Sequence, residues 1–254
     1  MPFSDLANKR AEFIRVSGDG LKAGRLHVGF HWEKACASTM PTSPDRRGLF
    51  LDLDGTIADS LGVLRCVYFR FLHEFNQEGS DAEFDRLNGP KLSEIVGALQ
   101  TEYHLRSDSS DLLAVYNRLI DAAYEEVLPQ PGIRELIVTA ANKGWIITVV
   151  TSNLGSRARS WLNRVGFDSL LQFMVSGEEV KRGKPWPDIY ELALARSGCV
   201  ARESIALEDS LLGARAARAA GLRTFLVVSN PKSLAQCPDG VEPVPNLTDL
   251  LVWL

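Results

Sequence analysis

From residue 48 onward, short runs of β-branched and aliphatic residues alternate with segments of helical pattern, and this alternation constrains the fold more than any other feature. The runs cover residues 49–51, 146–150, 173–175, 205–207 and 225–228. Continuous apolar runs of this length suit strands that are buried on both faces, and helices between such strands imply parallel βαβ units. We therefore predict an α/β fold built on a parallel sheet that is sandwiched by helices.

The segments between these runs carry helix signals. Pro187 suits the start of a helix, whereas Gly198 and Gly221 suit the residue that closes one. Residues 63–130 contain no strand-like run, but two groups of apolar residues there keep a helical period. The groups are Leu92, Ile95, Val96, Leu99 and Tyr103, then Leu112, Val115, Tyr116, Leu119 and Ala123. We predict an all-helical insertion over residues 63–130, which divides the core into residues 48–62 and 131–254.

Residues 1–47 differ from the rest of the chain, because they show no sustained hydrophobic period and carry eight basic and five acidic residues. The spacing of Phe3, Leu6, Phe13 and Ile14 allows a short amphipathic helix. The segment lacks the apolar run of a signal peptide, and its acidic residues are atypical of a transit peptide. We interpret it as an N-terminal extension and assign it no role.

Charge and cysteine usage exclude several classes of partner. The 28 basic and 32 acidic residues give a net charge of -4, so no basic excess favours binding to nucleic acid. No apolar stretch approaches the roughly 18 residues that a membrane helix requires. The four cysteines are far apart and lack the spacing of a zinc site. We expect a cytoplasmic protein with reduced thiols and with neither nucleic acid nor membrane as a partner.

Polar residues follow three of the predicted strands, and in an open parallel sheet ligands bind beyond the carboxyl ends of the strands. Asp52 and Asp54 follow the first run. A carboxylate can attack phosphorus to form an aspartyl phosphate, and Asp52 is placed for that role. A turn at Gly55 would bring Asp54 to the same side of the substrate, where it can protonate the leaving oxygen.

The other strand ends carry residues that suit a phosphoryl group and its counterion. Glu208 and Asp209 supply carboxylate oxygens, which fit Mg²⁺ better than zinc. Lys184 would hold both Asp52 and the phosphoryl oxygens, while Thr151 and the backbone amides of the following helix would donate hydrogen bonds to them. We therefore predict a phosphoryl-transfer site at this edge of the sheet.

Each of these residues also has an ordinary structural role open to it. Glu208 and Asp209 can charge the first turn of the next helix. Thr151 can cap the end of a strand, Lys184 can be a solvated loop charge, and Arg157 can be either a surface charge or part of the site. Their combined placement at the strand ends favours the catalytic interpretation of the acids, Thr151 and Lys184.

The segments DLDGTIADS, VVTSN, GKPWPDIY and LEDS resemble the four motifs of the haloacid dehalogenase superfamily of phosphatases and phosphomutases. The resemblance covers residues 48–254 and implies a Rossmann-like sheet. It also implies that Asp52 is the nucleophile and Asp54 the general acid and base. The residues that it assigns to phosphoryl binding are Thr151 and Lys184, and those that it assigns to Mg²⁺ are Asp52, Asp54 through its backbone carbonyl, Glu208 and Asp209.

The insertion is similar in position to the helical cap of the subfamily that includes phosphoglycolate phosphatase and β-phosphoglucomutase. The resemblance implies that a cap loop, here residues 87–91, helps to select the substrate, so Lys91 is a candidate substrate contact. Ser152 and Asn153 are further candidates for lining the site. The mutase relatives carry an arginine just after this loop, whereas this chain has Leu92, which counts against mutase activity.

Taken together, the residues and the resemblance predict a Mg²⁺-dependent phosphatase. Its substrate would be a small phosphorylated metabolite, a sugar phosphate or a phosphoglycolate-like compound, and the reaction would pass through an aspartyl phosphate. The alternatives are a phosphomutase of the β-phosphoglucomutase type and a non-catalytic metabolite-binding protein of the same fold. Asp54 disfavours dehalogenase and phosphonatase chemistry, because relatives with those activities replace the second aspartate.

Overall fold

The structure is a computed structural model that describes residues 46–228 and 234–254. The helix predicted around Phe3, Leu6, Phe13 and Ile14 lies outside these residues, as does Cys36. Cys66, Cys199 and Cys237, in the described part of the chain, are free thiols. No helix in the two described ranges is long and apolar enough to cross a membrane.

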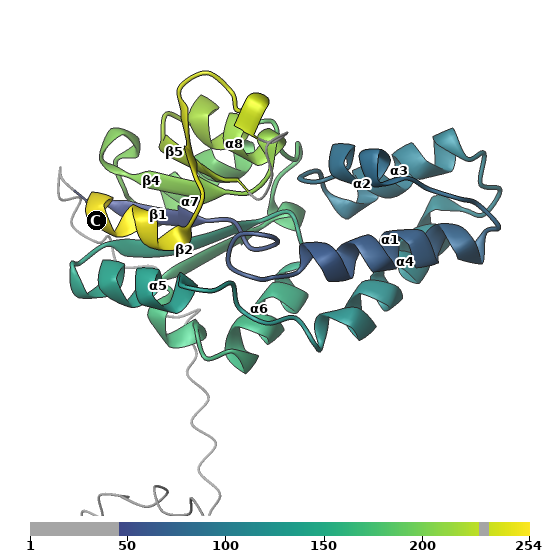
Figure 1. Cartoon of the computed structure of the whole chain (residues 1–254), viewed down its shortest axis with the longest axis horizontal. Coiled ribbons are helices and arrows are strands. Elements are labelled where there is room, and N and C mark those ends of the chain that lie inside the picture. Colours follow the sequence, from purple (N-terminus) through teal and green to yellow (C-terminus); the bar gives the residue numbers. More distant parts are fainter. Residues whose placement is uncertain (1–45, 229–233) are drawn as a thin grey trace, which may run out of the picture. The chain divides into compact units, whose positions relative to one another are not determined.

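A six-stranded parallel sheet forms the centre of the fold (Figure 1). Its strands are β1 (Gly48–Leu51), β2 (Ile146–Thr151), β3 (Phe173–Ser176), β4 (Ile205–Glu208), β5 (Arg223–Val227) and β6 (Val241–Val244). Their order across the sheet is β3-β2-β1-β4-β5-β6, and each neighbouring pair is parallel. This arrangement confirms the predicted α/β fold, because β1 to β5 coincide with the apolar runs.

The strand that the apolar pattern does not predict is β6. Its sequence is short and includes Pro243, which cannot donate a hydrogen bond to a neighbouring strand. The structure places β6 at the edge of the sheet, where it pairs with β5. A proline is tolerated at this edge, because the missing N–H costs no hydrogen bond on the open side.

Alternate residues of the strands face two layers of helices. Leu49 and Leu51 pack on one face with α5 (Ile133–Asn142) and α6 (Gly155–Arg164). Phe50 packs on the other face, in a cluster with α7 (Asp188–Ser197) and α8 (Leu211–Ala219). The strands are therefore buried on both sides, which explains why their sequences show no alternation of apolar and polar residues.

The predicted helical insertion is present between β1 and β2. Its helices are α1 (Leu61–Glu74), α2 (Asp81–Arg86), α3 (Leu92–Glu102) and α4 (Ser109–Tyr124). We call these four helices and their connecting loops the cap. The apolar residues with helical period lie on α3 and α4 or directly after α3, and the buried ones join the cluster that includes Leu49 and Leu51.

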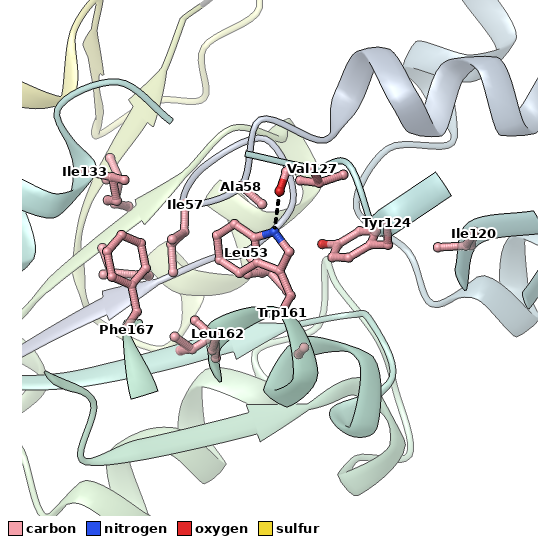
Figure 2. Close-up of a cluster of buried hydrophobic side chains, with 14 of the residues drawn as sticks. Leu53, Ile57, Ala58, Ile120, Tyr124, Val127, Ile133, Trp161, Leu162 and Phe167 are labelled. Carbon is pink, nitrogen blue, oxygen red and sulfur yellow. Dashed lines mark hydrogen bonds between the residues drawn. The ribbon is translucent and has the colours of Figure 1, made fainter. Parts of the chain in front are cut away.

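The two segments that connect the cap to the sheet are hydrogen-bonded to each other. The N–H of Asp59 donates to the carbonyl of Leu128, and the N–H of Gln130 donates to the carbonyl of Ile57, both at 2.8 Å. Figure 2 shows the apolar cluster at this junction, in which Trp161 Nε1 donates to the carbonyl of Val127 at 2.9 Å. The end of the cap is thereby packed against α6.

Candidate active site

Three of the predicted site residues stand at the carboxyl ends of neighbouring strands. Asp52 follows β1, Thr151 ends β2 and Glu208 ends β4, and all three are buried. The N–H of Asp52 donates to the carbonyl of Leu207 at 3.0 Å, so the pairing of β1 with β4 continues up to the site. The topology therefore brings together residues that are far apart in the sequence.

Lys184, in the loop before α7, joins two of the acids from the buried side. Its Nζ donates to Asp52 Oδ1 and to Glu208 Oε1, each at 2.5 Å. The hydroxyl of Tyr190 donates to the same Glu208 oxygen at 2.5 Å. Burial acts to lower the pKa of Lys184, but the attraction of Asp52 and Glu208 outweighs it and raises that pKa above its usual value. The ammonium therefore stays charged beside Asp52.

The carboxylate of Asp54 is held by three side-chain donors. The hydroxyls of Ser60 and Tyr124 donate to Oδ1 at 2.8 and 2.6 Å, and Asn153 Nδ2 donates to Oδ2 at 3.0 Å. Tyr124 is the last residue of α4, so one of these donors comes from the cap. Burial, with the negative charge of Asp54, raises the pKa of Tyr124 well above its usual value, which keeps its O–H a donor.

The turn predicted at Gly55 is present. Its φ is +83°, and a Cβ at this position would collide with the carboxylate of Asp209. Asp52 and Asp54 both line one cavity, as the predicted turn requires.

Carboxylates gather where the Mg²⁺ site is predicted. Asp52, Glu208 and Asp209 each offer an oxygen within 4.8 Å of the others. Burial and the charge of Glu208 raise the pKa of Asp209 to about 7, although a hydrogen bond from Asn88 Nδ2 at 2.9 Å opposes the shift. Burial likewise raises the pKa of Asp52 well above its usual value, against the attraction of Lys184. A divalent cation would balance this excess of negative charge, and an all-oxygen donor set fits Mg²⁺.

The cavity that Asp52 and Asp54 line has a volume of about 370 Å³. Asp209 and Ser210 also line it on the side of the sheet, and the cap supplies much of the remaining wall. Its volume falls within the range of about 300–1,000 Å³ that is typical of small-molecule sites. The catalytic acids therefore open onto a space that can hold a small substrate.

The three residues predicted at the end of β2 are all engaged in contacts. Thr151 Oγ1 accepts a hydrogen bond from the N–H of Asn153 at 3.0 Å. Ser152 Oγ donates to the carbonyl of Gly89 in the cap at 2.6 Å, and Asn153 contacts Asp54. Ser152 and Asn153 line the cavity. The phosphoryl-binding roles of these three residues stay predictions.

Lys91 and Arg157 connect the cap to the core. Lys91 lines the cavity, and its Nζ donates to the carbonyls of Val180 and Lys181, each at 3.0 Å. Arg157, on α6, forms an ion pair of 2.7 Å with Asp121 of α4 and is itself buried. The structure thus gives both residues protein partners, and a substrate contact by Lys91 stays a prediction.

Comparison with known proteins decides the family. The model of the haloacid dehalogenase-like hydrolase family matches residues 49–227. The chain belongs to this family. The match includes all four motif segments and the whole cap.

Individual haloacid dehalogenase-like hydrolases are similar to this chain, but at low sequence identity. The chain is 24% identical over 203 residues to the bifunctional riboflavin kinase/FMN phosphatase of Arabidopsis thaliana; the match covers 80% of this chain but 54% of that protein. It is 26% identical over 175 residues to the phosphorylated carbohydrates phosphatase of Thermotoga maritima, covering 68% of this chain and 81% of the other. The crystal structure of β-phosphoglucomutase from Clostridium difficile superposes with a TM-score of 0.72 at 18% identity, covering 81% of this chain and 93% of the other. This last likeness shows the fold alone.

Several residues of this haloacid dehalogenase-like site were not assigned from the sequence. Ser60 and Tyr190 lie within the motif segments, so the sequence indicated their segments but did not predict their contacts. Asn88 lies in the cap loop that was singled out for Lys91. Tyr124 lies in no motif and carries no local signal, because only the packing of α4 brings its hydroxyl to Asp54.

Proposed function

We propose that this phosphoric monoester hydrolase releases phosphate from a small phosphorylated metabolite, in a Mg²⁺-dependent reaction that passes through an aspartyl phosphate. The observation that carries the proposal is that Asp52 and Asp54 line one cavity while Lys184 holds Asp52 from the buried side. The names of the relatives from Arabidopsis thaliana and Thermotoga maritima support a phosphate ester as the substrate. A cytoplasmic location stays a prediction.

In the first step, an oxygen of Asp52 forms a bond to phosphorus as the bond between phosphorus and the ester oxygen breaks. The proton of Asp54 passes to the leaving oxygen, which departs as the free alcohol. The ammonium of Lys184 offsets the repulsion between Asp52 and the phosphoryl oxygens. This step leaves an aspartyl phosphate and an ionised Asp54.

In the second step, water attacks the phosphorus of the aspartyl phosphate. Asp54 accepts a proton from that water, and the bond between phosphorus and Asp52 breaks to release inorganic phosphate. The hydrogen bonds from Ser60, Tyr124 and Asn153 hold the Asp54 carboxylate in place for both proton transfers. Both aspartates return to their starting states.

Asp52 and Asp209 are the side chains that we assign to the cation, together with the backbone carbonyl of Asp54. When bound, Mg²⁺ supplies positive charge that balances the phosphoryl oxygens and the buried acids. Glu208 belongs to the same acidic cluster, but its Oε1 already accepts hydrogen bonds from Lys184 and Tyr190. Glu208 therefore also fixes the position of the lysine.

The test compares Asp52→Asn with Asp59→Asn, because Asp59 is an exposed carboxylate seven positions further along the chain. Purified proteins are assayed for phosphate release from a panel of phosphate esters, with and without Mg²⁺. We expect Asp52→Asn to lose activity by on the order of 10³-fold or more, since the nucleophile is removed, and Asp59→Asn to keep it. Sustained turnover by Asp52→Asn in a folded protein would exclude the covalent mechanism.

The same assay separates hydrolysis from phosphomutase activity. A hexose 1-phosphate gives free phosphate in hydrolysis but the 6-phosphate isomer in transfer. Leu92 after the cap loop, together with the protein contacts of Lys91 and Arg157, supports hydrolysis, because these contacts engage the cations that would bind a second phosphate. Formation of the 6-phosphate without free phosphate would reverse this assignment.

A further inference from the structure

The cavity beside Asp52 and Asp54 has apolar walls on the side of the cap. Residues from all four cap helices contribute to this wall, and most of them are only partly buried. They include Leu61 and Leu64 of α1, Phe84 of α2, Ile95 of α3, and Leu113 and Ile120 of α4. The space that receives the substrate is therefore polar at the carboxylates and mainly apolar at the cap, where Ser93, Tyr116 and Asn117 also line it.

The basic side chains of this wall already donate hydrogen bonds to protein groups. Among the described residues that line the cavity, Lys91 and Arg157 are the basic ones. The Lys91 ammonium donates to two carbonyls, and Arg157 pairs with Asp121 and donates to Asn153 Oδ1 at 2.7 Å. A second anionic group on a substrate would have to displace these contacts to gain a partner, and burying a charge without a partner is costly.

Hydroxyl groups fit the apolar wall poorly for a related reason. A polyol placed against leucine, isoleucine and phenylalanine side chains loses hydrogen bonds to water and gains none from these side chains. Two of the polar side chains nearby are committed to the protein, since Asn88 donates to Asp209 and Ser152 donates to the carbonyl of Gly89. An apolar group in the same place releases water from both surfaces and is favoured.

We propose that the ester cleaved at this site has an uncharged alcohol with a substantial apolar part, which the four cap helices select. The proposal rests on the proposed function, because that function places the phosphoryl group at Asp52 and so directs the alcohol toward the cap. It narrows the substrate class away from phosphoglycolate-like and bisphosphorylated compounds, whose second anion would meet the apolar wall.

The first arm of the test measures kcat/KM for a series of n-alkyl monophosphates from ethyl to hexyl phosphate, with glucose 6-phosphate as a polar comparator. The leaving alcohols are chemically alike, so differences within the series report contacts of the alkyl chain. We expect kcat/KM to rise about fourfold per methylene, and hexyl phosphate to exceed glucose 6-phosphate by at least about tenfold. Phosphate release with no rise along the series would overturn the proposal and leave the phosphatase function standing.

The second arm measures binding without turnover. Calorimetry in Mg²⁺ follows the affinity for n-alkylphosphonates of the same lengths, whose P–C bond the proposed mechanism does not cleave. Affinity that increases by a similar factor per methylene supports the apolar site, even if no ester is hydrolysed, in which case only the proposed function fails. Equal affinity along the series would overturn the proposal.

Matched variants connect the effect to the wall. Leu113→Asn replaces a leucine of the wall on α4 with a polar side chain of similar size, and Ile95→Thr replaces the isoleucine on α3 with a smaller polar side chain. Val115→Asn is the control, because Val115 is also partly buried on α4 but lies outside the cavity. We expect the hexyl-to-ethyl ratio of kcat/KM to fall at least about tenfold in Leu113→Asn, by a smaller factor in Ile95→Thr, and to stay unchanged in Val115→Asn.

Thermal unfolding of each variant shows whether it is folded. If Leu113→Asn does not fold, Ile95→Thr replaces it as the test of the wall. An equal fall of the hexyl-to-ethyl ratio in Val115→Asn would mean that general loosening of the cap, rather than the wall, carries the preference. That result would overturn the proposal.

Discussion

Asp54 accepts hydrogen bonds from three side chains that belong to separate segments of the chain. Ser60 precedes α1, Asn153 follows β2 and Tyr124 ends α4. The last of these bonds joins the cap to the residue that we assign as general acid and base. Tyr124 is therefore a positioning residue, because it acts on the reaction through Asp54.

Tyr124→Phe tests this role, since it keeps the ring in the cluster of Figure 2 and removes only the hydroxyl. We expect kcat to fall about tenfold while KM stays within about twofold, because a group that moves protons in the transition state loses its orientation. The free energy of unfolding should fall by about 1 kcal/mol, as for one hydrogen bond.

Tyr103→Phe is the matched control. The Tyr103 hydroxyl also donates to a carboxylate at 2.6 Å, that of Glu83, but neither residue lines the cavity. This variant should lose stability without the loss of kcat. Equal kcat values in the two variants would remove the positioning role of Tyr124.

Residue by residue, the sequence locates the groups at strand ends better than those supplied by the cap. Asp52, Lys184 and Asp209 were predicted as one site because the carboxyl ends of parallel strands meet at one edge. Tyr124 and Asn88 could not be predicted in the same way, since their positions depend on how helices pack over that edge. The cap loop was marked by resemblance, but which of its side chains reaches an acid is a matter of packing.

At the scale of elements, α8 begins so close to β4 that one of its residues must be glycine. A Cβ on Gly213 would lie well inside contact distance of the Glu208 carboxylate, whose Oε1 also accepts hydrogen bonds from Lys184 and Tyr190. The close approach of α8 to β4 therefore helps to fix Glu208, and through it Lys184.

Gly213→Ala and Gly97→Ala should have opposite effects, although both place alanine in a helix. Helix propensity alone favours alanine by up to about 1 kcal/mol, and a Cβ added to Gly97 on α3 would meet no atom within 4 Å, so Gly97→Ala should raise the free energy of unfolding. Gly213→Ala should lower it by about 1–3 kcal/mol through overpacking, and should lower kcat/KM at least about tenfold. Denaturant unfolding and phosphate release measure both. If Gly213→Ala stabilises the protein as Gly97→Ala does, the close packing of α8 on Glu208 is not required.

The elements themselves were predictable to the extent that they repeat a local pattern. The runs that became β1 to β5 are buried on both faces, so their composition alone marked them. The edge strand β6 was missed because Val241–Val244 is short and contains a proline, and its pairing depends on β5 rather than on its own sequence. Within the insertion, the helical period on α3 and α4 gave a helical prediction, whereas nothing in it indicated which face would line a cavity.

At the scale of the whole molecule, charge is unevenly shared between the cap and the rest. Residues 63–130 carry six basic and twelve acidic residues, although the net charge of the chain is -4. The field of the cap therefore does not attract an anionic ester from solution. The phosphoryl group must be attracted by nearby positive charges, which are Lys184 and the cation that we assign to the acids. The alcohol part of the ester is favoured by the apolar wall that receives it.

Truncation can test how much of the chain before β1 the enzyme needs, because backbone carbonyls just before β1 accept hydrogen bonds from the start of β2 and from the segment before β4. The N–H of Val200 donates to the carbonyl of Arg46 at 2.9 Å, and the N–H of Ile146 donates to the carbonyl of Arg47 at 3.0 Å. The Arg47 guanidinium also lies over the Trp145 ring, 4.9 Å from its centroid.

A chain that begins at Arg46 should keep kcat/KM within about twofold, since the described site uses residues from Asp52 onward. A chain that begins at Gly48 loses both acceptors and the ring contact, so its free energy of unfolding should fall by about 1–3 kcal/mol. Denaturant unfolding and phosphate release of the two proteins and the full chain measure these effects, and a large loss of activity in the chain that begins at Arg46 would give residues 1–45 a part in the reaction.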